Sequence, residues 1–343
     1  MAKVKTVLSW FCRVGVSIVL VAFLFLAPFT IMPSLLNSQA NINRVKDYDY
    51  QGILELWHIE TFEGGSASRS AFLEKQAINF EKENKGIYIV IKTMSLEQLQ
   101  LNLQNNQKPN MISFGIGVGD KITQDLISLN FNLNVRQDIL DGGKFNNQQL
   151  AMPYILGGYA LISQNQFTDT LNGKTGVGNV GTTNPFKAVK IENLKLSFAD
   201  NINCDSYNAY DKYLKGGYDN LLGTQRDVYR INNRVNKGLL SNINYKFLNG
   251  YTDLVQYISV FKSAEIEQEI CKQFVKKLIS DQAQSKLANI NLFSVLQNKK
   301  LYTDDIFGKM EESLSNNLKT ENVFLNTSMI KEEKEKYFEM VGV

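Results

Sequence analysis

The residue types that most often carry out catalysis or bind metals are scarce in this chain of 343 residues. It has one histidine, His58, and three cysteines, Cys12, Cys204 and Cys271. The chain therefore offers few side chains that could form a histidine cluster around a metal or pair a nucleophile with a histidine. No histidine and cysteine stand at the spacing of metal ligands. We expect no metal, no cofactor and no enzymatic activity.

Carboxylates and glycines follow the predicted strands of the N-terminal half. Glu60, Glu63 and Asp120 would be available for glycoside hydrolysis, but nothing in their spacing singles out a pair. A secreted glycan hydrolase therefore stays an alternative. The glycine-rich stretch 115–120 lacks both the dinucleotide spacing and the Lys-Ser/Thr of a phosphate-binding loop. We interpret it as the rim of a cleft, where Asp120 either accepts hydrogen bonds from a ligand or caps the next helix.

The N-terminus has the pattern of an exported protein. Three basic residues, Lys3, Lys5 and Arg13, precede a stretch without charge from Val14 to Asn43. Residues 1–40 are therefore predicted to be a signal peptide or an N-terminal membrane anchor, an uncleaved anchor being favoured, and residues 41–50 a linker. Without those three charges the formal net charge of +3 falls to about zero, which excludes a nucleic-acid binder.

The pattern of apolar residues after the linker predicts two α/β lobes. The first part is expected to have strands at 53–57, 87–91 and 111–114. One helix is expected to be capped by Ser66 or Ser68, to run to about Asn84 and to be ended by Gly86, and a second at 96–105 to be capped by Ser95. This alternation implies a parallel sheet, with a ligand site beyond the carboxyl ends of its strands. Residues 166–185 are rich in Gly, Thr and Asn and are predicted to be a loop or an excursion between the lobes.

The second part repeats the alternation less regularly. Helices are expected near 205–215 and 225–237, strands at 221–223 and 251–261, and then a long helix capped by Ser263. We assign residues 51–161 and 251–298 to lobe one, and residues 162–250 and 299–343 to lobe two. Whether Cys204 and Cys271 pair stays open at this point.

Several segments, in order along the chain, resemble one protein family. They are 54–65 with the helix that ends at 80–84, then 109–112, 152–154, 157–161 and 261–284. In this order they resemble the extracellular solute-binding proteins of bacterial ABC importers, in the sugar-type group that includes maltose-binding protein. The chain departs from that group in being shorter and in having no lipoprotein cysteine after its apolar segment.

The resemblance implies a periplasmic-binding-protein-like fold (type II): two α/β lobes with a hinge and an interlobe cleft, here preceded by an N-terminal apolar helix. It implies a receptor on the extracellular face of the bacterial cell membrane. Such a receptor closes on a small solute, here a carbohydrate, and delivers it to permease subunits in the membrane. A membrane-tethered sensor or surface binding module on the same fold is the alternative.

Sugar recognition uses an aromatic face together with polar groups that bind hydroxyls. We interpret Trp57 as either a stacking platform or a core side chain. Thr224 either contacts ligand or caps a helix, and Arg226 either contacts ligand or pairs with an acid. The candidate ligand-binding residues are Trp57, Glu60, Glu63, Arg69, Gly117, Asp120, Tyr154, Thr224, Gln225, Arg226 and Tyr251.

Overall fold

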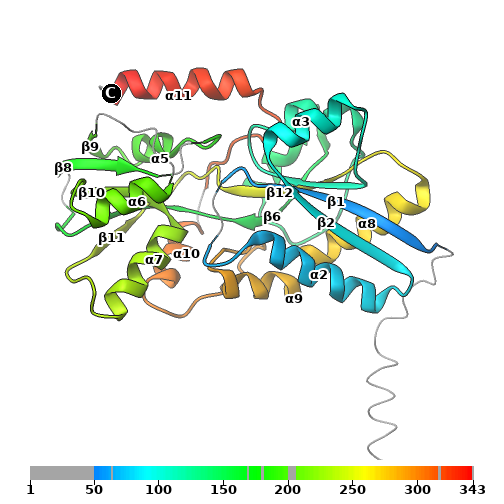
Figure 1. Cartoon of the computed structure of the whole chain (residues 1–343), viewed down its shortest axis with the longest axis horizontal. Coiled ribbons are helices and arrows are strands. Elements are labelled where there is room, and N and C mark those ends of the chain that lie inside the picture. Colours follow the sequence, from blue (N-terminus) through cyan, green and yellow to red (C-terminus); the bar gives the residue numbers. More distant parts are fainter. Residues whose placement is uncertain are drawn as a thin grey trace, which may run out of the picture. The chain divides into compact units, whose positions relative to one another are not determined.

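The computed structural model describes residues 50–62, 65–167, 170–178, 181–199, 206–315 and 318–341. Gly52–Lys82 and Gly86–Val343 form one compact unit (Figure 1). The predicted signal peptide or anchor, residues 1–40, lies outside the described residues, as does the linker except for Tyr50. Within the described ranges, no helix has both the length and the apolar character needed to cross a membrane.

The first lobe is built on a five-stranded sheet with the order β2-β1-β3-β12-β6. Its strands are β1 (Gly52–Ile59), β2 (Ile87–Met94), β3 (Met111–Phe114), β6 (Met152–Leu156) and β12 (Val255–Val260). β1 pairs in parallel with β2 and β3, whereas β12 is antiparallel to β3 and β6. The parallel arrangement predicted for the first three strands is confirmed.

The helices of the first lobe are α2 (Arg69–Glu83), α3 (Leu96–Gln104) and α8 (Glu265–Leu278). The rings of Phe80 in α2 and Phe274 in α8 pack edge to face, with centroids 5.4 Å apart. Ser95 caps α3 in a capping box with Gln98, as predicted. The prediction that Ser263 caps α8 is wrong: Ala264 occupies the N-cap position, and no side chain caps the helix.

Shorter elements connect these layers. They are η1 (Gly119–Lys121), η2 (Thr123–Asp125), α4 (Gln137–Leu140), η3 (Asp141–Gly143), the hairpin of β4 (Lys144–Phe145) and β5 (Gln148–Gln149), α9 (Asp281–Gln284) and η4 (Ser285–Ile290).

The second lobe has its own five-stranded sheet, with the order β11-β7-β10-β8-β9. The strands are β7 (Tyr159–Ser163), β8 (Thr170–Val177), β9 (Lys195–Phe198), β10 (Asn220–Thr224) and β11 (Asn244–Phe247), and the helices are α5 (Pro185–Ile191), α6 (Ser206–Leu214) and α7 (Gln225–Asn236). The loop predicted at 166–185 is wrong for Thr170–Val177. That stretch forms β8 because β9 and β10 pair with it on both sides.

Several connections join the two lobes. Only Gly157 and Gly158 separate β6 of the first sheet from β7 of the second. The chain returns between β11 and β12, and the strand predicted at 251–261 begins only at Val255. The remaining helices, α10 (Phe307–Ser313) and α11 (Thr327–Val341), come after α9 and η4 in the chain. α11 packs against α5 and β9 of the second lobe.

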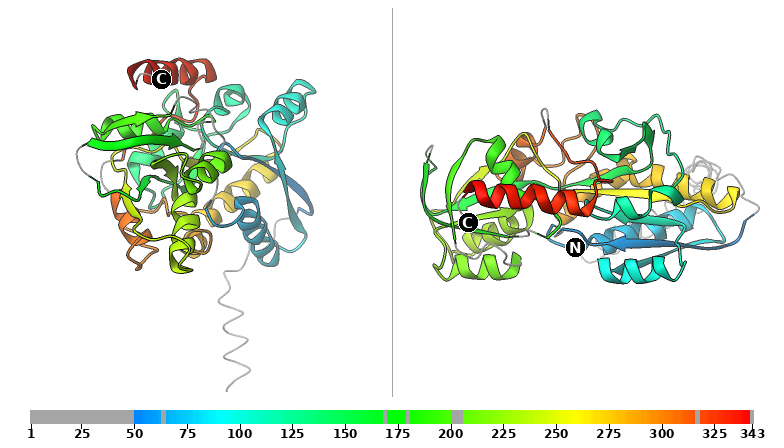
Figure 2. Two further views of the ribbon diagram at one scale, coloured as in Figure 1. Left: turned by 60° about the vertical axis from the view of Figure 1, so that its left-hand side comes forward. Right: turned by 90° about the horizontal axis from the view of Figure 1, so that it is seen from above.

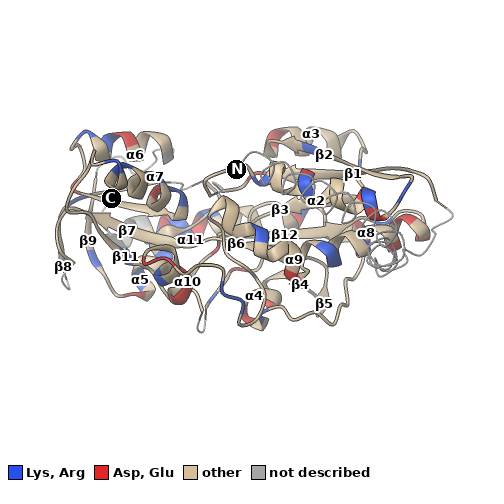
Figure 3. Ribbon diagram, turned by 90° about the horizontal axis from the view of Figure 1, so that it is seen from below, with Lys and Arg blue, Asp and Glu red and all other residues tan. Residues whose placement is uncertain are grey.

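Basic and acidic residues are interspersed over the described parts of both lobes (Figure 3). Several of them form ion pairs, such as Lys108 with Asp125 at 2.7 Å and Lys215 with Asp211 at 2.6 Å. This surface differs from the concentrated basic face of a nucleic-acid binder.

Candidate functional site

Loops from both lobes meet beyond the carboxyl ends of β1, β3 and β8. We call this place the interlobe seam and define it as residues 60–62 and 115–120 of the first lobe and 181–184 of the second. The Thr182 hydroxyl donates a hydrogen bond to the Thr61 carbonyl oxygen over 3.1 Å. Gly117, with φ of +91°, lies so close to Thr182 that a Cβ there would come within 2.8 Å of the Thr182 methyl carbon. The seam therefore lies where parallel strands predict a ligand site.

Phe62 connects the first-lobe side of the seam to the core of the second lobe. Its side chain is 4% exposed and belongs to the same buried apolar cluster as Tyr159, Tyr251 and Leu254. The Arg69 guanidinium stacks over the Phe62 ring at 4.2 Å and donates to the Phe62 carbonyl oxygen. A loop residue of one lobe is thus fixed against the apolar residues of the other.

A buried polar network lies beneath this contact in the first lobe. Arg69 donates to the Gln256 side-chain oxygen over 2.9 Å, and the Gln256 amide donates to the Ser113 hydroxyl over 2.9 Å. Ser113 also shares hydrogen bonds with His58 Nδ1 at 2.9 Å and with the Tyr154 hydroxyl at 2.6 Å. Burial and the Arg69 charge lower the pKa of His58 to about 3. Arg69 and Tyr154, both predicted to bind ligand, are committed to this network.

The second-lobe side of the seam is organised by Asp253, which no sequence pattern marks as a site residue. Its carboxylate accepts hydrogen bonds from the Tyr159 hydroxyl and the Asn184 backbone amide, each over 2.6 Å. Burial raises the pKa of Asp253, although these two hydrogen bonds act in the opposite direction. Asp253 lies in the crossover before β12, and Asn184 directly precedes α5. Nothing in their local sequence indicates that they meet.

An ion-pair cluster lies next to Asp253. Lys187 of α5 donates to Glu321 and, over 2.8 Å, to Glu333 of α11. Burial by itself lowers the pKa of Lys187, but the two carboxylates outweigh it and raise the pKa to about 12. Tyr251, a predicted ligand residue, is 1% exposed and donates to Glu321 over 3.2 Å. The charges of Lys187, Glu321 and Glu333 are therefore compensated by ion pairs within the protein.

Three side chains of the seam carry buried polar atoms without a hydrogen-bond partner among the described residues. They are Thr61 at its hydroxyl, Asp120 at Oδ1 and Asn184 at both atoms of its amide. Asn184 is 4% exposed. Buried polar groups are nearly always hydrogen-bonded, so these atoms are candidates for contact with a polar ligand. Thr61 and Asp120 come from the first lobe, and Asn184 comes from the second.

Of the other predicted ligand residues, Trp57 lies within β1, and Glu60 lies in the loop that follows this strand. Trp57 is 3% exposed and donates its indole N–H to Glu55 over 3.2 Å. Half of the Glu60 side chain is exposed, and its carboxylate lies 3.8 Å from His58 Nε2. Glu63 lies outside the described residues. Of the predicted residues, Glu60, Gly117 and Asp120 belong to the seam itself.

The three consecutive candidates at the start of α7 have local roles. Thr224 caps the helix in a capping box with Asp227. The Gln225 side-chain oxygen accepts a hydrogen bond from the Gly158 backbone amide over 2.9 Å, which ties α7 to the crossover between the lobes. Arg226 is half-buried in the first turn. Thr224 and Gln225 therefore stabilise the second lobe and its connection to the first.

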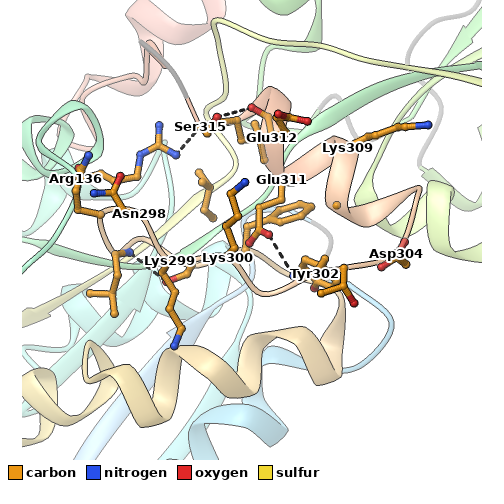
Figure 4. Close-up of a pocket in the computed structure, with 18 of the residues that line it drawn as sticks. Arg136, Asn298, Lys299, Lys300, Tyr302, Asp304, Lys309, Glu311, Glu312 and Ser315 are labelled. Atoms are coloured by element: carbon orange, nitrogen blue, oxygen red, sulfur yellow. Dashed lines mark hydrogen bonds between the residues drawn. The ribbon is translucent and has the colours of Figure 1, made fainter.

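A separate pocket of about 460 Å³ lies beside the crossover and contains none of the predicted residues (Figure 4). It is lined by Leu156, Arg136, the segment 293–305 and the polar face of α10. Arg136 pairs with Asp138 at 2.7 Å, and the Glu311 carboxylate accepts hydrogen bonds from the backbone amides of Leu301 and Tyr302. These charged groups support the pocket wall and do not define a ligand class.

Cys271 is buried as a free thiol in α8, where burial raises its pKa, while Cys204 lies outside the described residues. In the described part of the chain, no group of three or more His, Cys, Asp and Glu side chains is arranged to hold a metal ion.

Comparison with solved structures identifies the fold. The GacH receptor of Streptomyces glaucescens, solved unliganded and with acarbose, is 8% identical with a TM-score of 0.59, and the match covers 86% of this chain and 94% of that chain. The chain has the two-lobed solute-binding fold. The sugar-binding protein MalE of Xanthomonas citri shares this fold, with 12% identity, a TM-score of 0.60 and coverage of 84% and 92%.

The solute-binding fold also occurs in iron-bound HitA of Pseudomonas aeruginosa, which is 13% identical with a TM-score of 0.54 and coverage of 85% and 99%. No family model and no curated protein sequence matches the chain. All three structures are distant in sequence, so the comparison shows the fold alone. The ligand class has to be inferred from the side chains of the seam.

Proposed function

We propose that this chain is the extracellular substrate-binding component of an ABC importer and holds a small solute, a carbohydrate, at the interlobe seam. The observation that carries the proposal is the set of unpartnered buried polar atoms on Thr61, Asp120 and Asn184, contributed by both lobes. A guest that bonds to both lobes favours the closed arrangement over an open one, which is the basis of hinge closure.

The chemistry of the seam favours a neutral, hydroxyl-rich ligand. The Asn184 carboxamide offers donors and an acceptor, the Thr61 hydroxyl offers both, and the Asp120 oxygen accepts. Sugar hydroxyls match this combination, because each both donates and accepts. The nearby charges of Lys187, Glu321 and Glu333 pair with one another. The GacH receptor, solved with acarbose, and the sugar-binding protein MalE support the same class.

The proposed location follows from the fold and the sequence together. Binding proteins of this kind deliver solute to permease subunits from outside the membrane. The uncharged segment from Val14 to Asn43 supplies the export signal or the anchor. We therefore place the lobes on the extracellular face of a bacterial cell membrane, tethered or released according to whether residues 1–40 are cleaved.

Isothermal titration calorimetry on the full chain in detergent tests the proposal. The panel contains malto-oligosaccharides, chitin oligosaccharides, amino acids, short peptides and ferric ion. We expect saturable binding of one sugar class. Asn184→Ala is expected to weaken that binding about tenfold, the effect of losing one or two neutral hydrogen bonds. The control, Asn236→Ala at the exposed end of α7, should bind like the unaltered protein.

Binding of a different ligand class with no response to sugars would overturn the carbohydrate assignment. Equal sugar affinity of the unaltered protein and Asn184→Ala would instead show that the sugar binds outside the seam. Turnover of the bound glycan, followed by chromatography of the titration mixture, would support the hydrolase alternative.

A further inference from the structure

The last segment of the chain is attached to the first lobe before it reaches α11. The Val323 backbone amide donates to the Gly142 carbonyl oxygen over 2.8 Å. The Phe324 ring packs against the rings of Phe114 and Phe145, with centroids 6.1 Å and 5.7 Å away. Residues 318–325 thus bring the start of α11 to the first-lobe side of the seam.

α11 itself is attached to the second lobe. Glu333 pairs with Lys187 of α5 at 2.8 Å, and the Lys190 ammonium lies 5.0 Å from the centroid of the Tyr337 ring. Tyr337 also packs against the apolar cluster of the second lobe. Figure 2, in the view from above, shows α11 running from the middle of the described unit over the second lobe. The helix therefore connects the two lobes on one side of the seam.

Two residues of α11 bind the seam loops directly. The Thr327 hydroxyl donates to the Gly117 carbonyl oxygen over 3.4 Å, and the Lys334 ammonium donates to the Gly181 carbonyl oxygen. Lys334 is 7% exposed, although a buried ammonium is unfavourable unless it is compensated. Burial lowers the pKa of Lys334 to about 8, and the nearby Asp253 charge partly offsets this effect. Gly117 and Gly181 are parts of the two loops that meet at Thr182.

We propose that α11 is a strap that holds the two lobes together without a ligand, so that a solute reaches the seam only after Lys334 has released Gly181. The lobes are joined through α11 by bonds that lie wholly within the protein. The strap lowers the apparent affinity for any solute by the fraction of molecules in which it is released. The bonds that form the strap are the same whichever solute binds at the seam.

Hydrogen exchange followed by mass spectrometry on the full chain in detergent, without ligand, tests the strap. Lys334→Met removes the ammonium but keeps most of the apolar stem. We expect amides in 115–122 and 181–187 to exchange about ten- to a hundredfold faster, as for the loss of a buried hydrogen bond from a charged group. Lys331→Met is the matched control on the same helix, because the Lys331 side chain is 79% exposed.

Faster exchange in both seam peptides for Lys334→Met alone supports the strap. Exchange equal to that of Lys331→Met, in a folded protein, overturns it. If Lys334→Met does not fold, Glu333→Gln serves as the second variant, because it removes only the ion pair to Lys187. A smaller but measurable acceleration is expected for Glu333→Gln, and unchanged exchange overturns the proposal. A failure of the sugar titration leaves this test unaffected.

Discussion

The guanidinium of Arg69 lies 4.2 Å above the ring of Phe62 and donates to the carbonyl oxygen of the same residue. Arg69 begins α2, whereas Phe62 belongs to the loop that follows β1. One buried cation therefore fixes both the ring and the backbone of a residue that packs with the second-lobe cluster. Because Arg69 also binds Gln256 of β12, it connects the seam to the core of the first sheet.

Arg69→Leu should lower the free energy of unfolding by about 3 kcal/mol, because hydrogen bonds from a charged group are lost and buried acceptors remain. Urea denaturation measures the change. Lys75→Leu, at an exposed position of the same helix, should change the stability by less than about 0.5 kcal/mol. Similar effects of the two substitutions would show that the Arg69 network contributes little.

Acid should destabilise the protein through His58, its only histidine. The pKa of His58 is about 3 in the folded state, against 6.5 for the free side chain. The unfolded chain therefore binds the proton first as the pH falls. The contribution of neutral His58 to the free energy of unfolding is fully present above pH 6.5. It is lost progressively toward pH 3, by about 1.4 kcal/mol per pH unit.

Denaturation of the unaltered protein and of His58→Gln is compared between pH 6.5 and 5, where most carboxylates stay ionised. His58→Gln should show a flatter dependence of stability on pH over this range. An unchanged slope in His58→Gln would assign the acid sensitivity to other groups.

Gly117→Ala should lower the thermal stability of the protein for two separable reasons. The backbone at φ of +91° disfavours any residue with a Cβ, by about 1–2 kcal/mol. The new Cβ would also come within 2.8 Å of the Thr182 methyl carbon. Adding Thr182→Ser removes that methyl group and keeps the hydroxyl that bonds to Thr61. Thermal unfolding of both variants should show partial recovery in the double variant, and no recovery would mean that backbone strain alone is responsible.

Thr224→Ala should lower the stability by about 1 kcal/mol, the usual effect of removing an N-cap side chain. Thr224→Ser keeps a capping hydroxyl and should behave like the unaltered protein. Solute affinity should be similar for both variants, because the Thr224 hydroxyl caps α7. A loss of affinity in Thr224→Ala at unchanged stability would restore Thr224 as a ligand contact.

Local patterns in the sequence determined much of the first lobe. The runs that form β1, β2 and β3 are apolar, Ser95 caps α3, and Gly86 follows α2 with φ of +88°. Each of these features depends on neighbours a few residues away, so local sequence is sufficient. The Ser263 prediction failed even locally, because the N-cap of α8 lies one residue later, at Ala264.

Only the tertiary structure decided which side chains meet at the seam. Thr61 and Thr182 are 121 positions apart, and Gly181 and Lys334 are 153 apart. Asn184 and Asp253 have no sequence signature of a site, since their proximity results from the packing of loops and crossovers. The strand β8 arose in the same way, from pairing on both of its sides. Sequence periodicity reports which face of an element is buried, but it does not report which distant loop lies against it.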